Sequence, residues 1–248
     1  MTRISVELVP RDVEVLKEEV KTIKEKLSDV DFINIPDLLS CDTRSWDGAN
    51  IAKAYFDDVV PHLRAMDFDF TKDLPIKDKL REYNIKEVLV IEGDPPQSML
   101  YQVYPTISTD IIKKFSEEMP EITVYAGIDQ YRSSMKEEEY RIRRKQLAGA
   151  KGFFTQPFFD MRYLEMYADL LDGLDIYWGV SPVLSERSVS YWRNKNNVIF
   201  PKDFEPTLEW NIEFARKVID FAHKHNHNVY LMPIKAKIMP YLEGVFAK

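Results

Sequence analysis

Eight short apolar runs recur along the 248-residue sequence, and a segment with helical spacing follows each of them. Short apolar runs predict buried strands, whereas apolar residues at i, i+3 and i+4 predict amphipathic helices. We place strands at 4–9, 32–35, 62–66, 87–91, 122–126, 152–156, 176–180 and 228–232. We place helices at 12–27, 48–59, 74–83, 108–119, 136–147, 160–171, 185–193, 207–223 and 234–242. Strands that alternate with helices form a parallel sheet, and eight such units predict an α/β fold, a single TIM (β/α)8 barrel.

The length of the chain suits one such barrel. Barrels of this kind typically have about 250 residues, and no repeat, low-complexity tract or linker divides the sequence. We therefore expect residues 1–248 to form a single barrel domain. The alternative is a doubly wound sheet, but the dinucleotide-binding pattern G-x-G-x-x-G does not follow the first predicted strand.

The charge and the cysteine content restrict the classes of partner. The chain has 34 Lys and Arg against 41 Asp and Glu, a formal net charge of −7, whereas nucleic-acid-binding domains are usually basic. The single cysteine, Cys41, excludes an intrachain disulfide and a multi-cysteine metal site. No apolar run approaches the roughly 20 residues that span a bilayer, and no signal peptide precedes Ile4. We expect a cytoplasmic protein that binds neither nucleic acid nor membrane.

In a barrel of this type, function gathers at the carboxyl ends of the strands. The residues at or just beyond the predicted strand ends are Glu7, Asn34, His62, Asp94, Asp129, Gln156, Ser181 and Lys235. Glu7 is the most unusual of these, because alternation along its strand turns the side chain into the barrel. Burial would raise the pKa of its carboxyl and make it a proton donor near neutral pH. The alternative is an ion pair with a lysine or arginine inside the barrel.

Two other strand ends carry titratable candidates. Asp94 lies between Gly93 and two prolines, which hold the loop stiffly and present the carboxylate, although Asp in this context often only forms a turn. His62 is a candidate base or ligand, although a satisfied, partly buried histidine is the more common case.

The stretch 143–160 reads RRKQLAGAKGFFTQPFFD. Its first part predicts the end of an amphipathic helix, and Gly149 permits a close-packed exit from it. The next run ends in Thr155 and Gln156, as a buried strand does when its carboxyl end opens onto a site. The amide of Gln156 can donate and accept hydrogen bonds at a ligand edge. The alternative is an ordinary junction between strand and loop.

Motifs for several other chemistries are missing. The sequence contains no H-E-x-x-H zinc motif, no G-x-S-x-G nucleophile motif and no P-loop. His223, His225 and His227 form the run HKHNHN, for which a surface loop is the preferred interpretation over a metal site. We therefore expect no metal.

Three segments, ISVELVP, VLVIEGDPP and RRKQLAGAKGFFTQPFFD, together resemble the methylenetetrahydrofolate reductase family. In that family, a flavin-bearing TIM barrel reduces 5,10-methylenetetrahydrofolate to 5-methyltetrahydrofolate. The similarity runs in order along essentially the whole chain, and its most specific part is the run 145–160 with the patterns A-G-A and T-Q-x-F-F-D. The resemblance implies FAD as cofactor and a tetrahydrofolate as small-molecule substrate.

The resemblance also implies roles for individual residues. Glu7 matches the general acid that opens the five-membered folate ring to an iminium, and Asp94 matches the aspartate whose charge stabilises that cation. Gln156 matches the glutamine that hydrogen-bonds the pterin, and Trp192 falls where the family places an aromatic residue against the folate. The positions that match flavin-nucleotide contacts are His62, Arg144 and Lys145. Arg144 and Lys145 would equally suit a solvated helix face.

The departures from the family pattern fall mostly on the flavin side. Glu92 replaces an arginine, and Pro36 replaces a flavin-contacting threonine. The family's P-E-x-H-P-E segment is replaced by 127–132, and the last strand reads YLMP instead of F-Y-T-L-N. The folate side is therefore better preserved than the flavin side.

Three functions remain open from the sequence. The first is a flavin-dependent methylenetetrahydrofolate reductase. The second is a flavin-free, folate-dependent methyltransferase or demethylase that uses the same pterin pocket. The third is a non-catalytic subunit of a reductase complex, against which the retained set of Glu7, Asp94 and Gln156 argues. A homo-oligomer or a reductase partner subunit is compatible with each of them.

Overall fold

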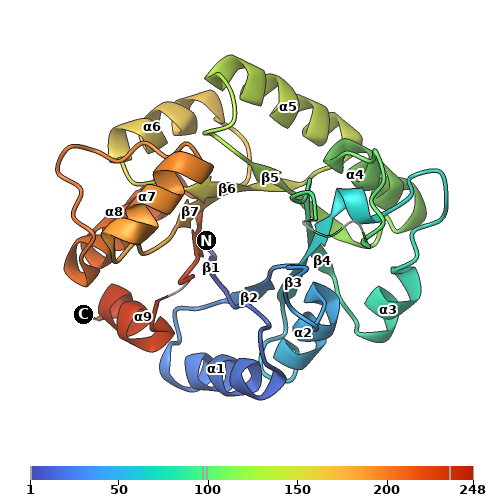
Figure 1. Ribbon diagram of the computed structural model, residues 1–248, viewed down its shortest axis with the longest axis horizontal. Coiled ribbons are helices and arrows are strands. Elements are labelled where there is room, and N and C mark those ends of the chain that lie inside the picture. Colours follow the sequence, from blue (N-terminus) through green and yellow to red (C-terminus); the bar gives the residue numbers. More distant parts are fainter. Residues whose placement is uncertain (1, 97, 99, 235, 248) are drawn as a thin grey trace.

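In the computed structural model, eight parallel strands close into a barrel that a ring of helices surrounds (Figure 1). The structure describes residues 2–96, 98, 100–234 and 236–247. The strands are β1 (Ile4–Glu7), β2 (Phe32–Ile35), β3 (Val59–Arg64), β4 (Glu87–Ile91), β5 (Thr123–Ile128), β6 (Gly152–Pro157), β7 (Ile176–Val180) and β8 (Asn228–Leu231). Each strand pairs in parallel with the next one, and β8 pairs with β1. The predicted TIM barrel is confirmed.

The helices follow the strands in the predicted alternation. They are α1 (Val13–Lys26), α2 (Ser45–Ala52), α3 (Lys77–Glu82), α4 (Ser108–Glu118), α5 (Met135–Ala148), α6 (Met161–Leu170), α7 (Glu186–Lys195), α8 (Leu208–His225) and α9 (Ile238–Phe246), with a short 3-10 turn, η1 (Ala65–Asp67). Side-chain oxygens cap the first turns of five helices by accepting backbone N–H groups. The capping residues of α1, α5, α6, α7 and α8 are Asp12, Ser134, Asp160, Ser185 and Thr207.

Several predicted boundaries are wrong. The closing helix predicted at 234–242 is α9, which begins at Ile238, and two further differences involve the segment before β3. The helix predicted at 48–59 ends at Ala52, and the strand predicted at 62–66 begins earlier, at Val59. Proline weakens a strand prediction because it cannot donate to the ladder, and Pro61 falls inside this run. The pairing of β3 with β2, in which Pro61 lies opposite Ile35, overrides that local signal.

The inside of the barrel is filled by large side chains. They form a cluster of Phe32, Val60, Leu89, Tyr125, Phe154, Tyr177, Tyr230 and Met232. The rings of Phe154 and Tyr177 stack with their centroids 4.1 Å apart. Because aromatic rings fill the middle of the barrel, polar side chains are confined to its two ends.

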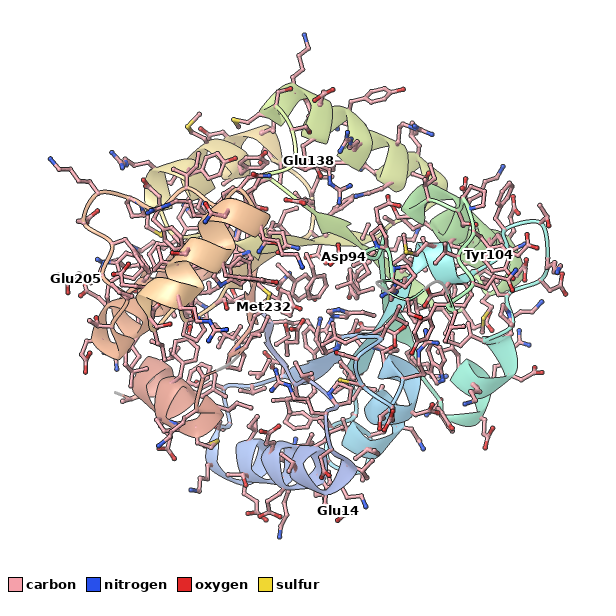
Figure 2. All side chains as sticks on the ribbon, in the orientation of Figure 1. Glu14, Asp94, Tyr104, Glu138, Glu205 and Met232 are labelled. Carbon is pink, nitrogen blue, oxygen red and sulfur yellow. The ribbon has the colours of Figure 1, made fainter. Side chains whose placement is uncertain are left out.

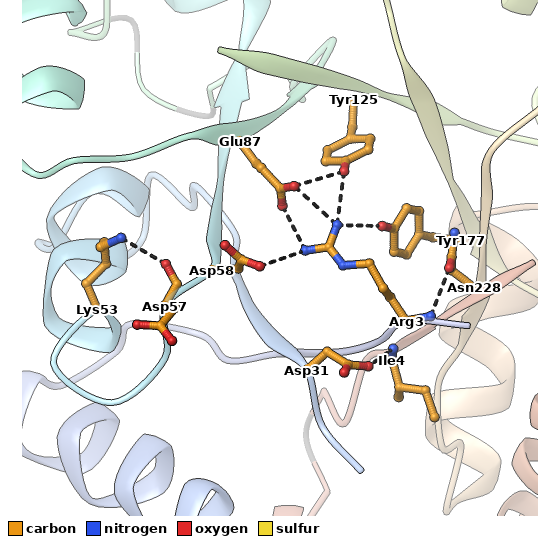
Figure 3. Close-up of polar contacts among 10 residues, drawn as sticks. All are labelled: Arg3, Ile4, Asp31, Lys53, Asp57, Asp58, Glu87, Tyr125, Tyr177 and Asn228. Carbon is orange, nitrogen blue, oxygen red and sulfur yellow. Dashed lines mark hydrogen bonds and ion pairs between the residues drawn. The ribbon is translucent and has the colours of Figure 1, made fainter. Parts of the chain in front are cut away.

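Arg3 holds the amino end of the barrel interior together (Figure 3). Its Nη1 and Nη2 atoms donate to the two carboxylate oxygens of Glu87 at 3.1 and 3.2 Å. Nη1 also donates to the hydroxyls of Tyr125 and Tyr177 at 3.2 and 3.0 Å. The guanidinium carbon lies 4.4 Å from the centre of the Phe32 ring. One side chain thus joins the segment before β1 to β2, β4, β5 and β7.

The described residues contain neither a membrane-spanning helix nor a cluster of metal ligands. No helix in them is long and apolar enough to cross a membrane. Nor do they contain a group of three or more His, Cys, Asp or Glu side chains placed to hold a metal ion.

Replacing Arg3 by methionine should destabilise the fold strongly. The change leaves Glu87 without its cation, and breaking a largely buried pair costs on the order of 3 kcal/mol. Urea unfolding monitored by circular dichroism measures this loss. The matched control is Arg81→Met, whose ion pair with Glu121 is about half exposed and should contribute about 0–1 kcal/mol. Equal unfolding midpoints for the two variants would contradict a structural role of Arg3.

Candidate functional site

Glu7 is the last residue of β1, and its side chain points into the carboxyl end of the barrel. It is only 7% exposed. The hydroxyl of Tyr230, on β8, donates a short hydrogen bond to Glu7 Oε2. His62 Nδ1, on β3, lies 3.9 Å from the same oxygen. Among the described residues, the partners of this buried carboxyl are therefore a tyrosine and a histidine, and none is the lysine or arginine of the alternative interpretation.

His62 is buried and joined to a second polar side chain. Asn34 Nδ2, on β2, lies 3.2 Å from His62 Nε2. Burial lowers the pKa of His62 to about 3, so the imidazole is neutral at physiological pH. When the amide donates to Nε2, the imidazole proton resides on Nδ1, on the side of Glu7. Asn34 Oδ1 is buried and has no hydrogen-bond partner among the residues that the structure describes, so it can accept one more hydrogen bond.

Burial raises the pKa of Glu7 to about 7, and the hydrogen bond from Tyr230 partly opposes this shift. Burial and the nearby Glu7 carboxylate raise the pKa of Tyr230 well above its ordinary value, so the phenol keeps its proton. A carboxyl of this kind is protonated in a substantial fraction of molecules near neutral pH. It can act as a general acid there, whereas an ordinary glutamate cannot.

Gln156 and Trp192 line one groove. The groove has a volume of about 680 Å³ and lies between the carboxyl ends of β6 and β7 and helix α7. Gln156 is exposed near the end of β6, and Trp192 is half-buried on α7. Ile234 also lines the groove, and it packs against the interior cluster that contains Tyr230. Ile234 therefore connects the groove with the interior cluster to which Tyr230 belongs.

Arg144 and Lys145 are neighbours on α5 but have different environments. Arg144 is exposed, and its guanidinium carbon lies 6.0 Å from the ring centre of Tyr140. Lys145 is buried, and its Nζ donates to the carbonyl of Gly127, on β5, at 2.6 Å. Burial lowers the pKa of Lys145, and the charges of acidic neighbours partly oppose this. Only Arg144 belongs to a solvated face.

Asp94 lies beyond the end of β4, in an exposed loop. Its backbone carbonyl accepts a hydrogen bond from Arg64 Nη2 at 2.8 Å. Gly93 adopts a φ of +88°, which favours glycine, and a Cβ there would lie 3.1 Å from Arg64. In Figure 2, Asp94 and Met232 both lie near the centre of the ring of strands.

The sequence-predicted residues therefore form three neighbourhoods at one end of the barrel. Glu7 meets His62 inside it, Gln156 meets Trp192 in the groove, and Lys145 and Arg144 lie on α5. The last two neighbourhoods touch, because Gln156 and Lys145 also line a small pocket of about 70 Å³. Asp94 is at the rim, apart from these three. Lys235, also a strand-end candidate, lies outside the described residues.

Sequence reasoning missed the role of Tyr230. The residue stands in the last predicted strand, with Asn228 and Met232 at the alternate positions that share its face. That alternation signals an inward side chain. Nothing in the local sequence signals that the first strand would bring Glu7 beside it.

Comparison with known proteins finds a distant similarity to one curated enzyme. No protein-family model matches it. The 5,10-methylenetetrahydrofolate reductase of Buchnera aphidicola subsp. Schizaphis graminum (strain Sg) is 22% identical over 147 residues. The chain is thus distantly similar to a methylenetetrahydrofolate reductase. The match covers 57% of this chain and 50% of the Buchnera protein, so the chain spans about half the length of that relative.

Solved structures share the barrel at low sequence identity. A Clostridium thermocellum protein that binds two copies of 5-methyl-5,6,7,8-tetrahydrofolic acid has a TM-score of 0.63 at 13% identity, over 98% of this chain and 92% of its own. Oxaloacetate acetylhydrolase has a TM-score of 0.62 at 9% identity, over 97% and 78% of the two chains. At these identities the likeness shows the fold alone, because one barrel supports many chemistries.

FAD, which the reductase resemblance implies, fits the residues present poorly. Arg132, Arg144 and Lys145 line a pocket of about 400 Å³ at the start of α4, and such cations suit a diphosphate. However, Glu92 also lines this pocket, and its carboxylate accepts from the backbone N and the Oγ of Ser108 at 3.1 and 2.6 Å. The helix N-terminus that would attract an anion already holds the chain's own carboxylate. A diphosphate would meet a negative charge there.

The stability of the protein should depend on pH through Glu7. The pKa of Glu7 is about 7 in the folded chain, compared with 4.5 for an ordinary glutamate. Stability from Glu7 is therefore fully present below about pH 4.5 and is lost as the pH rises through about 7. Relative to Glu7→Gln, the free energy of unfolding of the wild type should fall by about 3 kcal/mol between about pH 5 and pH 8. Urea titrations at both pH values test this, and parallel behaviour of the two proteins would refute the raised pKa.

Proposed function

We propose that this chain is a folate-dependent enzyme of one-carbon metabolism that uses Glu7 as its proton donor. The observation that carries the proposal is the buried Glu7 carboxyl, held by Tyr230 and with a pKa raised to about 7. The kinship with methylenetetrahydrofolate reductase and the folate-binding barrel from Clostridium thermocellum support a reduced folate as the ligand.

The groove beside Gln156 suits the two ends of such a ligand. A pterin edge presents donors and acceptors, which the Gln156 amide can match with its own acceptor and donors. An aryl ring packs well against an aromatic side chain such as Trp192. Both residues line the same groove, which supports their assignment to substrate binding.

The proton on Glu7 defines the chemistry that it can perform. Tyr230 donates to Oε2, so an acidic proton on Glu7 resides on Oε1. Its transfer to a folate nitrogen weakens the bond between that nitrogen and the one-carbon unit. When this bond breaks, its electron pair stays on the protonated nitrogen and Glu7 is left as a carboxylate. On ring opening of methylenetetrahydrofolate, the one-carbon unit stays on the other folate nitrogen as an iminium. On demethylation of methyltetrahydrofolate, the methyl group passes to a nucleophilic second substrate, such as a thiolate.

Two reactions share this step, and the surroundings of Glu92 favour one of them. Because Glu92 occupies the start of α4, we favour flavin-free transfer of a one-carbon unit over flavin-dependent reduction. The pocket with Arg132, Arg144 and Lys145 keeps flavin-dependent reduction as the second candidate. Arg64, which donates to the Asp94 carbonyl, positions the loop from which Asp94 would stabilise a cationic intermediate.

Replacing Gln156 by leucine should weaken folate binding. Loss of hydrogen bonds to the pterin edge should raise the Kd for 5-methyltetrahydrofolate about 10- to 100-fold, equivalent to about 1–3 kcal/mol. Isothermal titration calorimetry measures the Kd directly. The matched control is Gln146→Leu, at an exposed position of α5, which should bind like the wild type.

The same titrations separate binding from chemistry. Glu7→Gln keeps the acceptor for Tyr230 and should bind folate normally, while turnover of a one-carbon folate falls on the order of 10²–10⁴-fold. Unchanged turnover in this variant would remove Glu7 from the mechanism. Failure of the wild type to bind any reduced folate would refute the proposed function and leave the subunit alternative.

Flavin should bind weakly to the wild type and more tightly when Glu92 is neutralised. Glu92→Gln removes a like charge from the pocket, and we expect it to lower the Kd for FAD about tenfold or more. Fluorescence titration with FAD measures both proteins. Glu137→Gln, which changes the net charge equally at an exposed position of α5, is the control. A yellow wild-type protein that retains FAD on purification would restore the flavin-dependent reductase.

A further inference from the structure

Three pockets at the carboxyl end of the barrel share lining residues. Gln156 lines both the groove beside α7 and the small pocket of about 70 Å³. Glu92, Arg132 and Lys145 line both this small pocket and the pocket of about 400 Å³ at the start of α4. The small pocket therefore lies between the groove proposed for folate and the larger pocket, and it shares a wall with each of them.

The larger pocket has an excess of positive charge. Its charged side chains are one carboxylate and four cations, namely Glu92, Arg132, Arg141, Arg144 and Lys145. The protein as a whole has a formal net charge of −7, so this excess is local. A cationic pocket favours a small anion over a neutral or a cationic ligand.

The four cations differ in how far the chain itself engages them. Arg132 and Arg141 lie 3.5 and 3.8 Å from carboxylates of the chain, and Lys145 Nζ donates to a backbone carbonyl. Arg144 is exposed, and its guanidinium carbon lies 6.0 Å from the ring centre of Tyr140. No carboxylate in the described part of the chain pairs with Arg144. This guanidinium can therefore bind an anion without giving up an ion pair.

The sizes of the two pockets suit different parts of one ligand. The larger pocket, at about 400 Å³, falls within the range of about 300–1,000 Å³ that encloses whole small-molecule ligands. The small pocket, at about 70 Å³, is too small for a ring system and suits a single reactive group. A ligand held in the larger pocket can extend such a group through the small pocket toward Gln156.

Demethylation of a methylfolate requires a nucleophile, and the charge of these pockets restricts its class. An amine is protonated at neutral pH, and the cations repel the resulting ammonium group. An alcohol ionises only far above neutral pH. A thiol has an ordinary pKa of about 8.5, which nearby cations lower, so that the reactive thiolate forms near neutral pH. The pockets therefore favour a thiol.

We propose that the two pockets bind the methyl acceptor, a small thiol that carries a second, anionic group. The anionic group pairs with Arg144 in the larger pocket. The thiolate enters the small pocket and faces the folate held at Gln156. This inference rests on the proposed function and names the class of its second substrate.

The methyl transfer balances without an oxidant or a reductant. The thiol loses its proton to solvent, and the thiolate attacks the methyl carbon of methyltetrahydrofolate. The new sulfur–carbon bond forms as the carbon–nitrogen bond breaks, and the electron pair of the broken bond stays on the nitrogen that Glu7 protonates. The products are a methyl thioether and tetrahydrofolate, and Glu7 regains a proton from solvent.

The test measures methyl transfer from 5-methyltetrahydrofolate to two thiols by mass spectrometry of the thioether. The probes are 3-mercaptopropionate, which is anionic, and 2-mercaptoethanol, which is uncharged. Arg144→Gln should raise the KM for 3-mercaptopropionate about tenfold. It should leave the rate with 2-mercaptoethanol and the Kd for 5-methyltetrahydrofolate unchanged. Arg144→Lys, which keeps the charge but loses the planar fork, should give an intermediate KM.

Arg143→Gln is the matched control, because Arg143 is the exposed neighbour of Arg144 on α5 and does not line the pocket. It removes the same charge and should behave as the wild type with both thiols. Equal loss of activity in Arg143→Gln and Arg144→Gln would show a general charge effect and overturn the inference.

The remaining outcomes distinguish this inference from the function on which it rests. If Arg144→Gln uses 3-mercaptopropionate as well as the wild type does, Arg144 does not bind the acceptor and the inference is overturned. Folate binding by the wild type without transfer to either thiol overturns the inference and leaves the folate site standing. Absence of folate binding in the wild type would instead refute the proposed function itself.

Discussion

Closure of the sheet between β1 and β8 is the constraint on which the proposed site depends. The two strands pair with Ser5 opposite Tyr230 and Val6 opposite Leu231. Through this pairing, Glu7 receives a hydrogen bond from a tyrosine 223 positions away in the sequence. An unclosed sheet would leave Glu7 on a hydrated edge strand, with the pKa of an ordinary carboxyl. The closed barrel excludes water from Glu7 but keeps its hydrogen bond from Tyr230.

The barrel tolerates charge at its two ends in different ways. At the amino end, Arg3 is matched by Glu87 and two tyrosine hydroxyls, so both charges keep partners. At the carboxyl end, the neighbours of Glu7 within the described part of the chain are neutral, because burial holds His62 unprotonated. Burying an unpaired carboxylate is costly, so the proton stays on Glu7 to higher pH. Because desolvation of the Glu7 carboxylate raises its pKa, Glu7 can donate a proton near neutral pH.

The groove proposed for folate and the pocket considered for flavin differ in how their polar groups are engaged. Gln156 and Arg187 line an open groove. Glu92 and Lys145, by contrast, are bonded to Ser108 and to the carbonyl of Gly127. Groups that are already hydrogen-bonded must give up those bonds to bind a ligand, which reduces the net affinity. This contrast is the physical basis for expecting folate without tightly held flavin.

Periodicity alone determined the barrel and the direction of several site residues. Eight alternations of strand and helix specify a parallel barrel, and alternation within the first strand turns Glu7 inward. The position of Gln156 near a strand end was equally readable from the apolar run that ends in Thr155 and Gln156. These features depend on neighbours within a few residues, which is the range over which sequence patterns report.

The tertiary structure alone decided which of these residues meet. Tyr230 as the partner of Glu7, and α7 as the wall opposite Gln156, follow from strand closure and helix packing between distant segments. Arg144 and Lys145, adjacent in sequence, separate into an exposed and a buried side chain because successive helical residues point in different directions. The early start of β3 through Pro61 depends on its pairing with β2. Periodicity specifies the face of an element on which a side chain lies, whereas its partners depend on contacts that form only when the whole barrel closes.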